Sequence, residues 1–152
     1  MENVLKVCDV KLTYKTKVKS SERPVIVLAE DVYRLLIDYV YDKEIIQYKE
    51  CLKLILLNKA GKLLGVAHIS EGGIDETSAD IRIIMQAAIL GNATRIILAH
   101  NHPSGSLKPS TVDNLLTERV KNAAKLFNIT LLDHIIVTDS GYFSYLDEGR
   151  IL

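Results

Sequence analysis

Short apolar runs along the chain predict β-strands. Residues 51–57 are rich in leucine and isoleucine, and residues 62–70 follow them across Asn58-Lys59-Ala60-Gly61, a typical hairpin turn. A looser alternation at residues 4–14 predicts an earlier strand. Further strands are predicted at residues 95–99, 129–137 and 142–146.

Other segments carry their apolar residues at helical spacing. Residues 29–42 and 78–90 each place apolar side chains on one face, and Gly91-Asn92 supplies a stop after the second segment. A third helix is predicted to begin at Ser110 and to run to about Phe127. Strands and helices together predict an α/β fold, in which helices flank a mixed sheet.

Composition and charge narrow the class of protein. The chain has 152 residues, enough for one domain with a real core, and its 19 basic residues balance 19 acidic ones. No global field therefore favours nucleic acid or an anionic membrane. The basic residues 15–24 are interpreted as a solvated linker or edge strand rather than a phosphate site.

The expected compartment follows from three further features. The first residues lack the apolar core of a signal peptide, and no apolar run approaches the ~20 residues needed to cross a bilayer. Two cysteines fit a reducing environment. We therefore expect a cytoplasmic protein that does not bind membranes, and the sequence indicates no oligomeric state.

The stretch His100-Asn101-His102-Pro103-Ser104-Gly105 carries the candidate chemistry. The two histidines follow the predicted strand at residues 95–99, so their side chains can point the same way if the strand geometry persists. Asp113 follows eleven residues after His102, in the first turn of the next predicted helix. Two neutral imidazoles and a carboxylate are a ligand set of catalytic zinc, which keeps one position open.

Each of these residues also has a structural interpretation. A single histidine after a strand is more often a hydrogen-bonded residue of the core or surface, and Ser110 with Asp113 resembles a helix capping box. The combination favours a metal, because two of only four histidines lie beside two prolines, a glycine and an acidic helix start. We expect a metal site at His100, His102 and Asp113, and capping by Ser110 does not exclude it.

The spacing of His100-x-His102, Ser110 and Asp113 resembles the JAMM (MPN+) motif of metallopeptidases. Further similarity to the RadC-like branch of that group lies in His100 to Gly105, Leu131-Leu132-Asp133-His134, Gly141-Tyr142 and Asp147-Glu148-Gly149. We therefore expect a RadC-like JAB/MPN domain at residues 45–152, with a strand-and-helix extension at residues 1–44 packed on it as part of one globular unit. Longer RadC-like proteins carry a helix-hairpin-helix segment, and residues 1–40 show no such glycine hairpin.

The resemblance implies a cytidine-deaminase-like fold and one zinc ion held by His100, His102 and Asp113. It also implies a glutamate as general acid/base, for which Glu50 is the best match and Glu44 an imperfect competitor. The motif serine is Ser110, whose hydroxyl could donate to a developing oxyanion. The implied function is hydrolysis of a peptide or isopeptide bond by metal-activated water, on a peptide or protein substrate.

Three other residues are interpreted as structural. His134 lies in an apolar strand, where a satisfied core histidine is favoured over a role beside the metal. His68 lies in a hairpin strand with no motif around it. Cys51 begins an apolar strand without a local histidine, so a packed core residue is favoured over a nucleophile.

Two other functions stay open. One is a DNA-repair-associated accessory protein without peptidase activity. Its nucleic-acid contacts could use Arg119, Lys121 and Lys125, although a solvated helix face is the default and the neutral net charge disfavours strong binding. The other is a non-catalytic MPN scaffold, a class that loses the ligands retained here.

Overall fold

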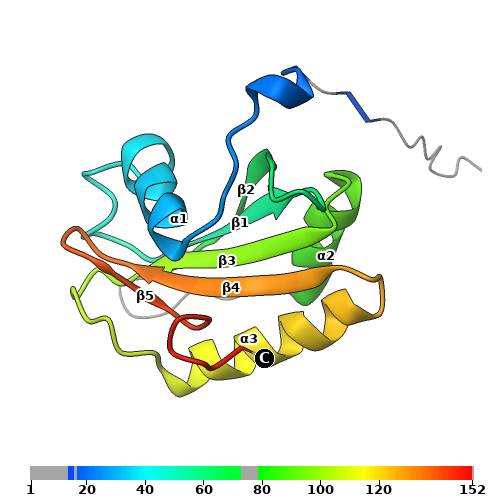
Figure 1. Ribbon diagram of the computed structural model, residues 1–152. Helices are drawn as coiled ribbons and strands as arrows, with labels where there is room; N and C mark the ends of the chain where they lie inside the picture. Colours follow the sequence, from blue (N-terminus) through cyan, green and yellow to red (C-terminus); the bar gives the residue numbers. More distant parts are fainter. Residues whose placement is uncertain (1–13, 16, 73–78, 152) are drawn as a thin grey trace, which may run out of the picture.

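The computed structural model describes residues 14–15, 17–72 and 79–151, which form three layers with a sheet in the middle (Figure 1). The strands are β1 (Cys51–Leu57), β2 (Leu63–Glu71), β3 (Arg95–Asn101), β4 (Thr130–Val137) and β5 (Tyr142–Ser144). The helices are α1 (Ala29–Leu35), α2 (Ile81–Leu90) and α3 (Thr111–Lys125), with a 3-10 turn η1 (Ser20–Glu22) and a π-helical turn η2 (Leu36–Val40).

The sheet is mixed, with the strand order β2-β1-β3-β4-β5. β1 pairs antiparallel with both β2 and β3, and β4 pairs antiparallel with β5. β3 and β4 are parallel, so the chain must cross over between them, and α3 lies in that crossover. The prediction of a mixed α/β fold is confirmed.

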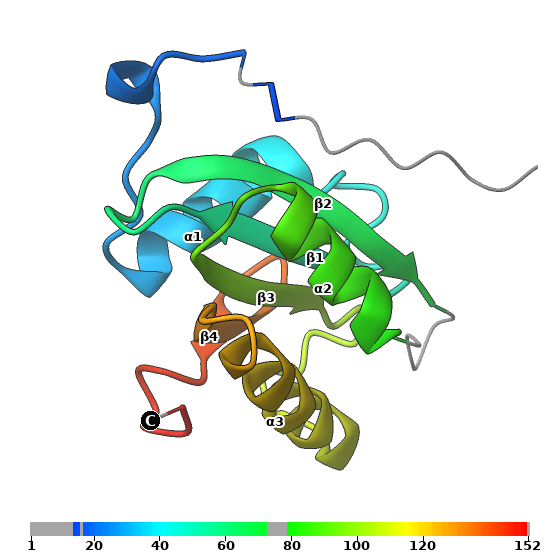
Figure 2. The same cartoon turned by 90° about the vertical axis from the view of Figure 1, so that its right-hand side faces the viewer.

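Two apolar cores cover the two faces of the sheet. Helix α1 covers one face, whereas α2 and α3 pack together on the other (Figures 1 and 2). Because side chains alternate along a strand, Leu98 of β3 packs toward α2 and α3, and Ala99 packs toward α1. By the same alternation His100 belongs to the α3 face and Asn101 to the α1 face.

Most predicted elements lie within one or two residues of the observed ones, and β3 differs in a way that matters. It continues to Asn101, two residues past the predicted end. It does so because His100 still pairs with Leu52 of β1 and with Ile136 of β4. The first histidine therefore lies inside a regular strand rather than in a loop.

Three other expectations differ from the structure. The helix predicted at residues 29–42 is divided into α1 and η2 and ends at Val40. Helix α2 begins at Ile81 rather than at residue 78. Asp80 caps this start, because its carboxylate accepts a hydrogen bond from the Arg82 N–H. The strand predicted at residues 4–14 lies outside the described residues except for Tyr14, which is in no strand. Among the described helices, none is both long and apolar enough to span a bilayer.

Candidate metal centre

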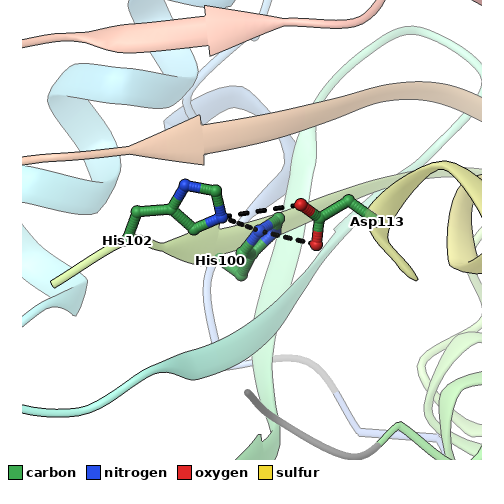
Figure 3. A group of neighbouring side chains, drawn as sticks. All are labelled: His100, His102 and Asp113. Atoms are coloured by element: carbon green, nitrogen blue, oxygen red, sulfur yellow. Dashed lines mark hydrogen bonds and ion pairs between the residues drawn. The ribbon is translucent and has the colours of Figure 1, made fainter. Parts of the chain in front are cut away.

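The three predicted ligands come from the end of β3 and the start of α3 (Figure 3). His100 is the penultimate residue of β3, and His102 follows two residues later, so both rings turn toward α3. The intervening loop turns at Gly105, whose φ of 77° is readily adopted only by glycine. Asp113 then points back from the first turn of α3. The structure thus brings together the three residues that the sequence predicted.

The potential ligand atoms converge on a small volume. His100 Nε2 lies 2.9 Å from His102 Nε2 and 3.2 Å from Asp113 Oδ1, and His102 Nε2 lies 3.6 Å from Asp113 Oδ2. One ligand atom from each residue falls within 4.8 Å of the others, so the group could hold a metal ion. For comparison, two nitrogens on a tetrahedral zinc would be roughly 3.3 Å apart, given zinc–nitrogen bonds of about 2.05 Å.

The chemistry of the donor set also fits a cation. His102 Nδ1 lies 2.7 Å from the Ser106 carbonyl oxygen, which can only accept, so this nitrogen carries the hydrogen. In a neutral ring His102 Nε2 then presents a lone pair toward His100 Nε2 and Asp113. A lone pair, a second imidazole nitrogen and a carboxylate in mutual contact need a positive charge among them.

The pKa values of the site also favour a cation among these groups. Burial alone would raise the pKa of the Asp113 carboxyl, but its contacts with His100 and His102 outweigh that effect and hold the pKa far below its usual range. The hydrogen bond with Asp113 raises the pKa of His102 despite partial burial. The carboxylate therefore stays charged and attracts cations.

Ser110 fixes the Asp113 carboxylate through a capping box. The Ser110 N–H donates to Asp113 Oδ2 at 2.6 Å, and the Asp113 N–H donates to Ser110 Oγ at 3.1 Å. The helix-capping interpretation is confirmed, and it is compatible with ligation because Asp113 Oδ1 still faces His100.

Glu50, the predicted general acid/base, lies just before β1 and is 8% exposed. β1 and β3 pair antiparallel as far as Leu52 opposite His100; Glu50 lies two residues before Leu52, and His102 lies two residues after His100. The hydrogen bond with Asp113 is the main cause of the raised pKa of His102, and the Glu50 charge makes a smaller contribution in the same direction. Glu44, the competing glutamate, is exposed.

The sequence profile of the RadC-like JAB domain family matches residues 26–150. The chain belongs to this family. Relatives include UPF0758 proteins of Porphyromonas gingivalis, 50% identical over 99 residues (64% of this chain and 44% of the relative), and of Thermotoga maritima, 37% identical over 114 residues (74% and 51%). The chain spans about half the length of the curated relatives it matches.

Sequence reasoning missed one residue of this RadC-like JAB domain, the asparagine between the two histidines. The buried Asn101 side chain accepts from the Cys51 N–H at 2.8 Å and donates to the carbonyl oxygens of Ile46 at 2.7 Å and Lys49 at 2.9 Å. These bonds hold the backbone on both sides of Glu50. The sequence offered one signal, since the alternation of side chains along a strand places the Asn101 amide on the face of the sheet opposite the ligands.

His134 was interpreted as a core histidine, and it is fully buried on β4. Its Nε2 nevertheless lies 2.8 Å from His100 Nδ1, a contact that the sequence did not predict. Burial lowers the pKa of His134 well below its usual value, which disfavours the charged ring. Cys51 is buried, as interpreted from the sequence. His68, interpreted as a structural residue of a hairpin strand, contacts Lys53 and Glu71 on the β1–β2 hairpin.

Proposed function

We propose that this RadC-like JAB domain is a zinc-dependent hydrolase that cleaves a peptide or isopeptide bond. The observation that carries the proposal is the convergence of His100, His102 and Asp113 at one point. Two imidazoles and one carboxylate match a catalytic zinc site that keeps a position open for water or substrate. When bound there, zinc would act as a Lewis acid and make water a stronger nucleophile at neutral pH.

Glu50 is the proposed general acid/base. Its carboxylate would take a proton from the attacking water and deliver it to the leaving amine, which typically contributes ~10²–10⁴ in rate. The burial of Glu50 and its position just before β1, whose Leu52 pairs with the metal ligand His100, support this role. Asn101 would keep the backbone around Glu50 in place.

Ser110 is the proposed donor to the developing oxyanion. Its bond with the Asp113 N–H uses an oxygen lone pair, so the hydroxyl hydrogen remains able to donate to substrate. Loss of a donor of this kind typically costs ~10²-fold or more in kcat. The proposed position, beside Asp113, is consistent with a carbonyl approaching the metal.

Metal analysis followed by an activity screen tests the proposal. The purified chain, supplied with zinc, is expected to hold about one zinc per molecule and to cleave members of a peptide and isopeptide library. Glu50→Gln should keep the zinc and lose hydrolysis. Glu44→Gln, which changes an exposed glutamate of the same segment, is the matched control and should behave as the parent.

Different failures point to different errors. A chain that binds no stoichiometric zinc would overturn the metal site itself. A zinc-loaded chain that cleaves nothing in the library would favour a scaffold or a DNA-associated accessory role. An active Glu50→Gln variant would remove Glu50 from the mechanism and leave the metal site intact.

A further inference from the structure

We propose that His134 and Thr117 are positioning residues that fix the tautomer of His100, so that its Nε2 lone pair faces the metal. The inference rests on the proposed function only in requiring that a metal binds at His100. It concerns two residues outside the ligand set, one on β4 and one on α3.

The assignment of protons starts at Thr117. Its hydroxyl donates to the carbonyl oxygen of Asp113 at 2.7 Å, and the hydroxyl oxygen of Thr117 also lies 2.7 Å from His134 Nδ1. A threonine hydroxyl has one hydrogen, and a carbonyl oxygen can only accept. Thr117 must therefore accept from His134, and His134 Nδ1 carries a hydrogen.

The assignment then passes to His100. Full burial disfavours a charged His134 ring, so with the hydrogen on Nδ1 its Nε2 is bare and can only accept. This Nε2 lies 2.8 Å from His100 Nδ1, which must be the donor. His100 Nε2 is left without a hydrogen, at 3.2 Å from Asp113 Oδ1. This is the tautomer that a metal requires at that nitrogen.

We call this chain of hydrogen bonds, from Asp113 through Thr117 and His134 to His100, the relay, and packing holds it rigidly. His134 is fully buried, and its ring stacks on Tyr145 with centroids 4.9 Å apart and 10° between the planes. The Tyr145 hydroxyl donates to Asn114 Oδ1 on α3 at 2.8 Å. The relay begins at the backbone of one ligand, Asp113, and ends at the ring of another, so it ties the two elements that supply the metal site.

Imidazole nitrogen NMR of the metal-free parent chain tests the assignment directly. His100 and His134 are both expected to carry a hydrogen on Nδ1. A neutral His100 ring with its hydrogen on Nε2 rather than on Nδ1 would overturn the proposal. This measurement needs no substitution, and it does not depend on hydrolysis.

Zinc affinity, measured by competition with a chelator, provides the second test. His134→Phe keeps an aromatic ring against Tyr145 but removes the acceptor for His100, and the dissociation constant for zinc is expected to rise ~10–100-fold. His134→Gln can offer an amide oxygen near the position of Nε2 and should restore part of the affinity. His68→Phe, a histidine substitution on β2, is the matched control and should leave the affinity unchanged.

The same variants separate this inference from the proposed function. In His134→Phe, the His100 hydrogen should move to Nε2 in the metal-free chain, a change that a loss of packing alone would not produce. Unchanged zinc affinity in folded His134→Phe would overturn the relay even if the parent is an active hydrolase. A parent that binds zinc and shows the expected tautomers but cleaves nothing would refute only the hydrolase.

Discussion

Replacing Asn101 with leucine is the sharpest test of how the segment around Glu50 is held beside the metal ligands. Leucine has a similar size and fits an apolar environment, but it leaves the Cys51 N–H and the carbonyl oxygens of Ile46 and Lys49 without their side-chain partner. Each intramolecular hydrogen bond contributes about 0.5–1.5 kcal/mol net, and a buried polar group left unpaired costs about 1–3 kcal/mol. Three such bonds give an expected loss of about 3 kcal/mol.

Urea unfolding of the metal-free chain measures this loss. For a domain of this size, about 3 kcal/mol corresponds to a fall of roughly 6–12 °C in Tm. Gln47→Leu is the control, because Gln47 lies in the same segment and its side-chain bond to Asp139 is exposed. That substitution should change stability by less than about 0.5 kcal/mol.

The reasoning fails if Asn101→Leu and Gln47→Leu lose the same stability. It also fails if Asn101→Leu loses less than about 1 kcal/mol, since the three bonds would then be replaceable by water or by local relaxation. If the proposed function is right, folded Asn101→Leu should retain zinc with reduced kcat, because the bonds hold the segment of Glu50 rather than the ligands.

Two further predictions concern stability. Gly91→Ala should cost about 1–3 kcal/mol in urea unfolding, because the new Cβ would clash with Leu56 Cδ1 and lie 2.9 Å from the Ala87 carbonyl oxygen. The control Gly65→Ala meets no atom within 4 Å and should be neutral or slightly stabilising. Burial raises the pKa of Asp133, so the folded chain keeps this proton to a higher pH than the unfolded chain. Stability from this group should therefore fall as pH rises from about 4 through the raised pKa, and the slope should be shallower in Asp133→Asn; equal slopes for the two metal-free chains would contradict it.

The ligand set could be predicted from the sequence because it is local. His100, His102 and Asp113 lie in one strand–loop–helix unit, so their convergence depends on the strand period, on one turn and on the first turn of a helix. The positions of the strands were equally accessible, because buried strands are continuous apolar runs. The end of β3 was missed by two residues, because it depends on whether pairing with β1 continues past Ala99.

The supporting contacts could not be predicted because they depend on register between distant segments. Asn101 contacts Cys51, 50 residues away, and His100 contacts His134, 34 residues away. A shift of one residue in either pairing would turn the side chain to the opposite face of the sheet. The π-helical turn after α1 could not be predicted for a different reason, because the apolar spacing of residues 29–42 continues through it without a break.

The shortness of the segment between His102 and Asp113 also bears on the order of assembly. Closing a loop of about ten residues takes roughly 10–100 ns and costs little chain entropy, whereas bringing β1 to β3 joins parts of the chain some 50 residues apart. The unit that carries His100, His102 and Asp113 can therefore form early, before the β1–β2 hairpin has paired with β3. Partial denaturation that detaches this hairpin would be expected to leave a species that still captures metal but has lost the neighbourhood of Glu50.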